Sequence, residues 1–250
     1  LTIALGAVAY ARYNVVQSAS DLNETMTKTE QIFGKDVTES LKKWSSTSAK
    51  ALGQSQRQAL DAASTFAVFG KSAGLSGKEL ENFAKQNTQL ASDFASFFNT
   101  KPEDAITAIG AAFRGENEPI RRYGVLLDDA SLRNEALKQG LIATTKKALT
   151  PQQKVLAAQA LILKQTKDAQ GDFARTADGA ANKQRILSAT VEDTKAKIGQ
   201  GLLPAYQNLL NKLIPLADWT AKNSSLLTKL RSEEHTSELQ SHLNLVCRLL

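Results

Sequence analysis

The order of apolar and polar positions along the chain fits a series of helices. No stretch shows the sustained alternation of apolar and polar residues that a half-buried strand requires. The pattern therefore predicts an all-α protein with essentially no sheet. The predicted helices cover residues 2–33, 36–53, 55–72, 77–98, 102–114, 129–139, 151–170 and 181–224.

Several helix starts have the pattern of a capping box, in which a side chain accepts from the backbone N–H three residues later and that residue's side chain reaches back. The pairs are Asp36 with Glu39, Ser76 with Glu79, Thr100 with Glu103, and Thr150 with Gln153. Pro151 favours the last pair, because proline fits the first helical position. Glycine adopts the left-handed conformation at little cost. The predicted glycine stops are Gly34, Gly70, Gly74, Gly115 and Gly140.

Large apolar residues recur every eleven positions in the last predicted helix. The two series are Leu187, Ile198 and Leu209, and Val191, Leu202 and Leu213. An eleven-residue repeat is typical of a nearly straight or slightly right-handed packed helix. Pro204 removes a backbone hydrogen bond, so we expect a kink near residues 200–204. The alternative is two shorter amphipathic helices joined at the sequence GQGLLP.

The spacing of helices and turns divides the chain into parts. Residues 1–54 are N-terminal helices, 55–150 form a compact region of short helices, and 151–230 form a long helical hairpin or extended helix. We therefore expect a compact multi-helix region flanked by long extended helices. The chain opens at Leu1 and its single methionine is Met26, so we interpret both ends as the ends of a fragment.

The last twenty residues differ from the rest of the chain. Residues 231–242, RSEEHTSELQSH, resemble the translation of a common sequencing-library adapter, with all twelve codons matching. We interpret 231–250 as an adapter-derived artefact and exclude it from the fold. A genuine polar linker with a short apolar tail is the alternative. This segment contains His235, His242 and Cys247, which are the only histidines and the only cysteine of the chain.

Without that segment the chain has neither histidine nor cysteine. A Cys/His zinc site, a disulfide and a Ser/Cys–His nucleophile pair are thereby excluded, and no cofactor is expected. The net charge of the whole chain is +6, and it becomes +7 without the last twenty residues, which hold two basic and three acidic side chains. Nucleic-acid-binding domains usually gather basic residues on one face, whereas here the lysines alternate with polar and acidic residues.

Residues 113–129, FRGENEPIRRYGVLLDD, place two carboxylates beside three arginines. Glu116 and Glu118 are candidates for general acid–base chemistry, but the arginines favour the ionised carboxylate. A carboxylate that stays ionised is a poor general acid, and no nucleophile is recognisable nearby. We therefore expect a structural turn, in which Pro119 keeps Glu118 out of the helical conformation. The chain is expected to turn at Gly115 and Gly124.

Residues 171–185, GDFARTADGAANKQR, follow the helix predicted over 151–170. Gly171 ends that helix, Phe173 is suited to anchor apolar surface, and the last long helix begins within the polar run. We expect a hinge between two helices. A phosphate cradle is the alternative, although these glycines do not follow a strand as those of phosphate-binding loops do.

These two segments resemble the tail tape measure proteins of long-tailed bacteriophages and related prophages. That family has an RGE-x-EPLRRFGV segment, a helix-rich spacer, a GDFARTxxxxANxQR segment and a long helix with a GxxLLP step. The first block matches at Arg114, Gly115, Glu116, Glu118, Pro119, Arg121, Arg122, Gly124 and Val125, and departs mildly at Ile120 and Tyr123. The second block matches at Gly171, Asp172, Phe173, Arg175, Thr176, Ala181, Asn182, Gln184 and Arg185. The step matches from Gly201 to Pro204, and the whole match covers roughly residues 30–220.

The resemblance implies a structural protein of the virion rather than an enzyme, with no small-molecule substrate and no catalytic, cofactor-binding or metal-binding residue. Tape measure proteins occupy the lumen of the growing tail tube, set tail length and leave with the DNA at ejection. The implied partners are the tail tube protein, the tail assembly chaperones and further copies of the chain, with transient contact to DNA or the host membrane at ejection. The implied location is the virion tail, and the host cytoplasm during assembly.

Two other functions stay open from the residues alone. A membrane-active or cell-wall-active ejection module needs an uninterrupted apolar span or a catalytic acid. The opening sequence LTIALGAVAYARY is too short to cross a membrane. A generic helical scaffold needs a continuous heptad or a repeat at a fixed period, and the sequence holds neither.

Overall fold

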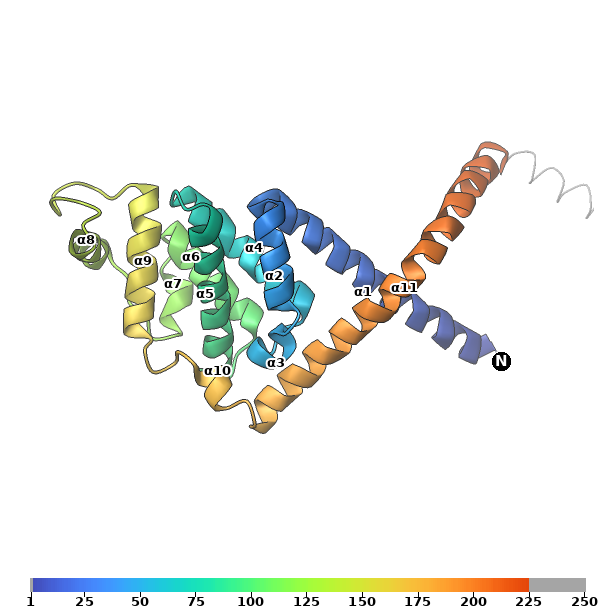
Figure 1. The fold of residues 1–250 in the computed structure, drawn as a ribbon, viewed down its shortest axis with the longest axis horizontal. Coiled ribbons are helices and arrows are strands. Elements are labelled where there is room, and N and C mark those ends of the chain that lie inside the picture. Colours follow the sequence, from blue (N-terminus) through green and yellow to red (C-terminus); the bar gives the residue numbers. More distant parts are fainter. Residues whose placement is uncertain (1, 225–250) are drawn as a thin grey trace, which may run out of the picture. The chain divides into compact units, whose positions relative to one another are not determined.

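The computed structural model describes residues 2–224, and within this range it contains eleven α-helices and no strand (Figure 1). The expected all-α fold is confirmed. The described chain is divided into two compact units between Gln200 and Gly201. The segment 231–250, interpreted above as adapter-derived, lies outside the described residues.

The helices follow the predicted order, with short elements added between the longer ones. Helix α3 arises because the helix predicted over 36–53 is broken, and α7 and α10 each form a single turn inside a segment expected to be a loop. The bounds are α1 (Thr2–Phe33), α2 (Lys35–Ser45), α3 (Ser48–Leu52), α4 (Gln56–Ser72), α5 (Gly77–Phe97), α6 (Pro102–Arg114), α7 (Glu118–Arg121), α8 (Asp129–Lys138), α9 (Pro151–Gln165), α10 (Asp172–Arg175) and α11 (Ala180–Lys222).

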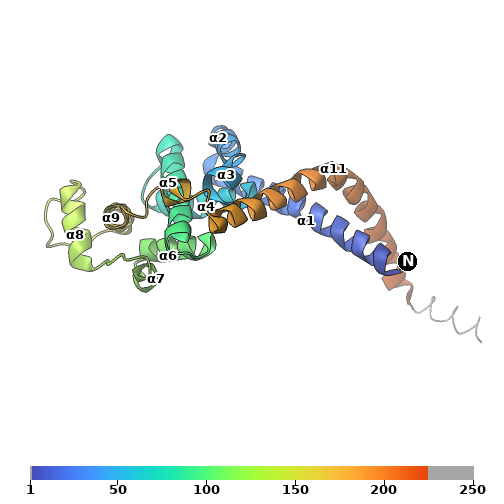
Figure 2. The ribbon, with the colours of Figure 1, turned by 90° about the horizontal axis from the view of Figure 1, so that it is seen from below.

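Helices α4 and α5 pack against each other and form the centre of the first unit. Helices α6 and α9 lie on one side of this pair, and α1 and α2 lie on the other (Figures 1 and 2). Helix α8 packs on α9 at the end of the row. The helices therefore form a row in which every long helix buries one face against a neighbour, as the packing of amphipathic helices requires.

The core of the first unit is one continuous set of buried apolar residues that extends from Leu22 in α1 to Ala196 in α11. Its centre is aromatic, since the ring of Phe113 on α6 lies 5.6 Å from that of Phe83 on α5 and 6.4 Å from that of Phe66 on α4. The packed region thus reaches beyond the expected 55–150 on both sides, because the apolar faces of α1, α2 and α9 complete the core.

The helix starts follow the predicted capping boxes only in part. The boxes that form are Ser55 with Gln58, Asp128 with Ser131 and Thr150 with Gln153, of which only the last was predicted. Three predicted boxes are wrong, because their helices begin without a side-chain cap after Gly34, Ser76 and Lys101. In the last case Pro102 starts α6, and this leaves Thr100 outside the helix.

One predicted helix end was wrong, and one break in a predicted helix was missed. Gly70 was expected to end a helix, but it lies inside α4. A Cβ at this position would come within 2.6 Å of Leu80 Cδ1, so the glycine allows α5 to approach α4. The predicted helix 36–53 is broken at Ser46 and Thr47, whose hydroxyls donate to carbonyl oxygens three residues earlier and so compete with helix continuation.

In the second unit, α11 runs as a helix through Pro204 and Pro215 to Lys222. The alternative of two shorter helices joined at GQGLLP is therefore wrong, whereas the kink expected at 200–204 stays a prediction. Large apolar side chains of this unit, including Trp219, are exposed. Over the range 2–224, no helix is long and apolar enough to cross a membrane.

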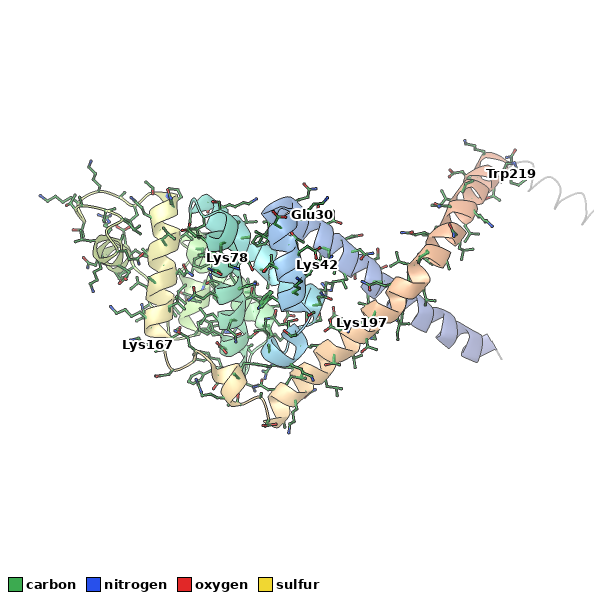
Figure 3. The ribbon with its side chains drawn as sticks, in the orientation of Figure 1. Glu30, Lys42, Lys78, Lys167, Lys197 and Trp219 are labelled. Carbon is green, nitrogen blue, oxygen red and sulfur yellow. The ribbon has the colours of Figure 1, made fainter. Side chains whose placement is uncertain are left out.

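Basic side chains are spread over the elements of the first unit rather than gathered on one of them. Lys42 lies on α2, Lys78 on α5, Lys167 in the turn after α9 and Lys197 on α11 (Figure 3). Lys78 pairs with Glu81 on its own helix at 3.0 Å. This distribution agrees with the dispersed charge of the sequence and is typical of solvated helix faces.

Candidate functional site

The second block of the resemblance folds against the C-terminal part of α5. Gly171, with φ 73°, leads into α10. The carboxylate of Asp93 on α5 accepts hydrogen bonds from the backbone N–H groups of Gly171 (2.9 Å) and Phe173 (3.2 Å). It thereby satisfies donors of the first turn of α10, which have no partner within the helix. Burial raises the pKa of Asp93, and the two N–H donors oppose part of that shift.

Ser96 on α5 binds polar side chains from two other elements. Its hydroxyl donates to Asp172 Oδ2 at 2.6 Å and accepts from Asn182 Nδ2 at 2.9 Å. Asn182 is 3% exposed, and the same Nδ2 also donates to Thr176 Oγ1 at 2.8 Å. A buried amide needs such partners, and here they connect α5, α10 and α11.

Arg185 attaches the first turns of α11 to the end of α5. Its Nη2 donates to the carbonyl oxygens of Ala95 (3.0 Å) and Thr100 (3.2 Å), and its Nη1 donates to Asn182 Oδ1 (2.7 Å). A cation is favourable at this point because the last carbonyls of a helix lack partners and carry partial negative charge. Asn99, with φ 50°, supplies the left-handed residue that ends α5.

Two further residues of the second block support this arrangement. Arg175 donates to the carbonyl oxygens of Gln170 (2.6 Å) and Asp168 (2.8 Å) and so closes the turn before α10. Phe173 is buried against Gly53, where a Cβ would lie 2.7 Å from the ring. We call the polar side chains that hold α10 and α11 on α5 the latch; they are Asp93, Ser96, Asp172, Thr176, Asn182 and Arg185.

The first block of the resemblance reaches the same end of α5 through one aromatic side chain. Tyr123 is buried and stacks on Phe94 of α5 with ring centroids 4.9 Å apart. Its hydroxyl lies 3.3 Å from Thr100 Oγ1, and the carbonyl of Thr100 accepts from Arg185. The two blocks therefore meet at Thr100, although α8 and α9 separate them in the sequence.

The charged residues of the first block lie at the surface. Arg114 pairs with Glu116 at 2.9 Å, and Arg121 pairs with Glu118 at 2.8 Å. The hydrogen bond from Arg114 lowers the pKa of Glu116, which suits an ion pair and disfavours a general acid. Glu118 is the first residue of α7. The expectation that Pro119 keeps it out of a helix is therefore wrong, because proline fits a first helical turn.

The remaining residues of the two blocks occupy turns or exposed positions. Gly115 ends α6 with φ 91°, and Gly124 has φ 75°, as the predicted turns require. The guanidinium of Arg122 lies over the ring of Tyr123. Gln184 is exposed and takes no part in the latch, and Pro204 belongs to the second unit.

The residues at the C-terminal end of α5 and just after it, which complete the site, were not predicted from the sequence. Asp93, Ser96 and Thr100 lie in the segment SDFASFFNT, outside both blocks of the resemblance. One signal was present, because Asp93 and Ser96 are spaced three residues apart and therefore share a helix face between phenylalanines. Nothing in their spacing indicated which distant segment they bind.

The polar side chains of the latch form hydrogen bonds that hold helices together. A surface hollow of about 450 Å³ adjoins it, lined also by Phe97, Asn99 and Gly179. Among residues 2–224, no group of three His, Cys, Asp or Glu is placed to bind a metal ion. Comparison of the chain with protein-family models, with curated proteins and with solved structures gives no match.

Proposed function

We propose that this chain is a tail tape measure protein of a bacteriophage or prophage, acting as a structural ruler inside the tail tube and released with the DNA at ejection. The observation that carries the proposal is that both blocks of the resemblance pack on the end of α5, the first through the aromatic ring at position 123 on Phe94 and the second through Arg185, which attaches α11 there. Two separate segments that resemble one family thus pack at one place, where a long helix joins a compact helical unit.

The length of the last helix suits a ruler. Helix α11 has 43 residues, and a helix rises by about 1.5 Å per residue. Contour length is therefore proportional to residue number in this part of the chain. The first unit, with its continuous core, acts in this proposal as a folded station along the ruler.

The partners follow from the exposed side of α11. Leu187, Val191 and Ile198, which we call the outward face, are 64%, 45% and 56% exposed. Exposed apolar residues at regular helical spacing indicate a binding surface. Further copies of this chain offer the same eleven-residue spacing, so we assign this surface to a homo-oligomer in the tail lumen.

The other proposed partners of the chain bind it during tail assembly or at ejection. The tail tube protein surrounds the assembled copies, and the tail assembly chaperones bind the chain in the host cytoplasm before it enters the virion tail. Contact with DNA or the host membrane is transient and occurs at ejection. The proposal assigns the chain neither a catalytic reaction nor a small-molecule substrate.

Tail length after an insertion tests the proposal. Three further copies of residues 203–213, inserted after Leu213 in the encoding phage or prophage, add 33 residues. If that part is a helical ruler, the tails lengthen by about 50 Å, as measured on electron micrographs. The matched control places the same 33 residues in the exposed loop between α8 and α9, where they leave the ends of the first unit in place. Unchanged tail length after the helix insertion would refute the ruler.

A further inference from the structure

The part of α11 that lies in the first unit presents mainly small and polar residues to its neighbours, with Ile186 half-buried among them, and most of its large apolar residues to solvent. The residues that face the unit recur every three or four positions; they are Asn182, Arg185, Ala189, Asp193, Ala196 and Gly199. The outward face lies on the opposite side of the same helix. Most helices that dock permanently on a core do the reverse.

The contacts beyond the latch are also polar or made by small residues. Asp193 Oδ1 accepts from the backbone N–H of Gln56, in the first turn of α4, at 2.7 Å, and Glu192 pairs with Arg57 at 2.9 Å. Further along, a Cβ at Gly199 would lie 2.0 Å from the carbonyl oxygen of a residue in α1. Helix α11 therefore approaches α1 closely, and the residues that meet there, Gly199 and the buried Ala19 of α1, are small.

Helix α9 shows the contrasting case within the same unit. Its buried residues include Val155, Leu161 and Ile162, so its separation from the core would expose large apolar side chains to water. Separation of α11 exposes mainly small residues, which are Ala189, Ala196 and Gly199 on α11 and Ala19 on α1, and Ile186 is the one large apolar side chain that is half-buried on this part of α11. The polar partners of the latch exchange protein hydrogen bonds for hydrogen bonds to water. Burial of apolar area dominates the free energy of docking, so α11 is held far less firmly than α9.

We infer that the latch is a releasable fastening: residues 180–200 of α11 leave the first unit as a helix while α4, α5, α6 and α9 stay folded. The local opening of one element at a lower free energy than global unfolding is the behaviour expected of a weakly packed element. Release frees α11 from the first unit and leaves the aromatic core in place. The inference rests on the contacts of α11 and does not depend on the proposed function.

Spin labels on the otherwise wild-type latch test the release directly. Cysteines replace two exposed residues, Asn82 on α5 and Lys197 on α11, with Cys247 changed to serine. Pulsed electron paramagnetic resonance follows the distance between the labels in increasing urea. The fluorescence of Trp44, which packs on the core, reports the rest of the unit once Trp219 is replaced by phenylalanine. We expect a second, broader distance population at urea concentrations below the Trp44 transition. If the label distance and the Trp44 fluorescence change at the same urea concentration, the inference is wrong.

A matched pair of variants then identifies the latch as the fastening. In the doubly labelled protein, Asn182→Ala with Arg185→Ala removes hydrogen bonds to α5, whereas Gln184→Ala alters an exposed neighbour on the same helix. The loss of several hydrogen bonds raises the undocked population by at least about tenfold without urea, and the control keeps the wild-type distance. The Trp44 transition stays in place in both. A latch variant that keeps the wild-type distance, or that moves the Trp44 transition together with the distance, overturns the inference.

Discussion

Replacing Glu81 by glutamine removes a buried negative charge that connects α2 to α5. Glu81 is 2% exposed. Its carboxylate accepts from Ser40 Oγ on α2 at 2.6 Å and from Lys78 Nζ at 3.0 Å, and it pairs with Lys85 on its own helix. Glutamine keeps the size of the side chain but leaves the lysine ammonium groups without an ionised partner, so we expect the variant to be less stable at neutral pH.

The magnitude follows from the pKa of this carboxyl group. Burial by itself raises the pKa, but hydrogen bonds from Lys85, Ser40 and Lys78 outweigh burial and lower it from 4.5 to about 2. One pKa unit corresponds to about 1.4 kcal/mol, so the ionised group stabilises the fold by about 3 kcal/mol at pH 7. Because the folded pKa lies below the unfolded one, this stabilisation is complete above pH ~5 and is lost as the pH falls toward about 2. About 2 kcal/mol of it is lost by pH 3.

Urea denaturation at pH 7 and pH 3 measures both effects. At pH 7, Glu81→Gln is expected to lower the free energy of unfolding by about 3 kcal/mol. Between pH 7 and pH 3 the variant loses about 2 kcal/mol less than the wild type, because it lacks the titrating group. The exposed Glu79 on the same helix provides the control, and Glu79→Gln is expected to follow the wild type. If Glu81→Gln loses as much stability between pH 7 and pH 3 as the wild type, the ionised Glu81 carboxylate does not stabilise the fold.

Three further substitutions address the contacts of α11 and of the first block. Gly199→Ala places a Cβ 2.0 Å from the carbonyl oxygen of Val15, so the docking of α11 should lose roughly 1–3 kcal/mol and the undocked population seen with the two spin labels should rise; an unchanged label distance contradicts the close approach of α1. Tyr123→Phe keeps the stacked ring and loses the contact with Thr100, which should lower the free energy of unfolding by only about 0.5–1 kcal/mol. Glutamine at all three residues of the outward face should lower the mass found by analytical ultracentrifugation while stability changes within about 0.5 kcal/mol per residue. Association equal to that of the wild type counts against the proposed homo-oligomer.

The fold was predictable wherever a signal acts within one helical turn. The bounds of α6, Pro102–Arg114, were predicted to the residue, and glycine after the end is a local determinant. At its start the predicted cap at Thr100 was wrong, and the local determinant is Pro102. The role of Gly70 was not predictable, because it depends on the approach of Leu80 from another helix. The break at Ser46 was missed because a serine hydroxyl is compatible with either a helix interior or a helix end.

Only one side of the candidate site could be predicted from the sequence. The second block already contained Asp172, Asn182 and Arg185, and its polar run indicated a hinge before the last helix. What it lacked were the partners on α5, which lie 76 to 90 residues earlier in the chain. A hydrogen bond between such distant residues depends on how the intervening helices pack, and no local spacing encodes it.

The sequence by itself determined the helical class, the starts and ends set by proline and glycine, and the eleven-residue spacing of large apolar residues in the last helix. Only the tertiary structure decided which side of that helix faces the compact unit. Packing places Ala189 and Ala196 inside and the outward face in solvent. The reason is physical: helical periodicity sorts residues onto faces, but the choice of the buried face depends on the neighbours. Here Ser96, the carbonyl of Ala95 and Arg57 supply polar partners for the polar residues of that face.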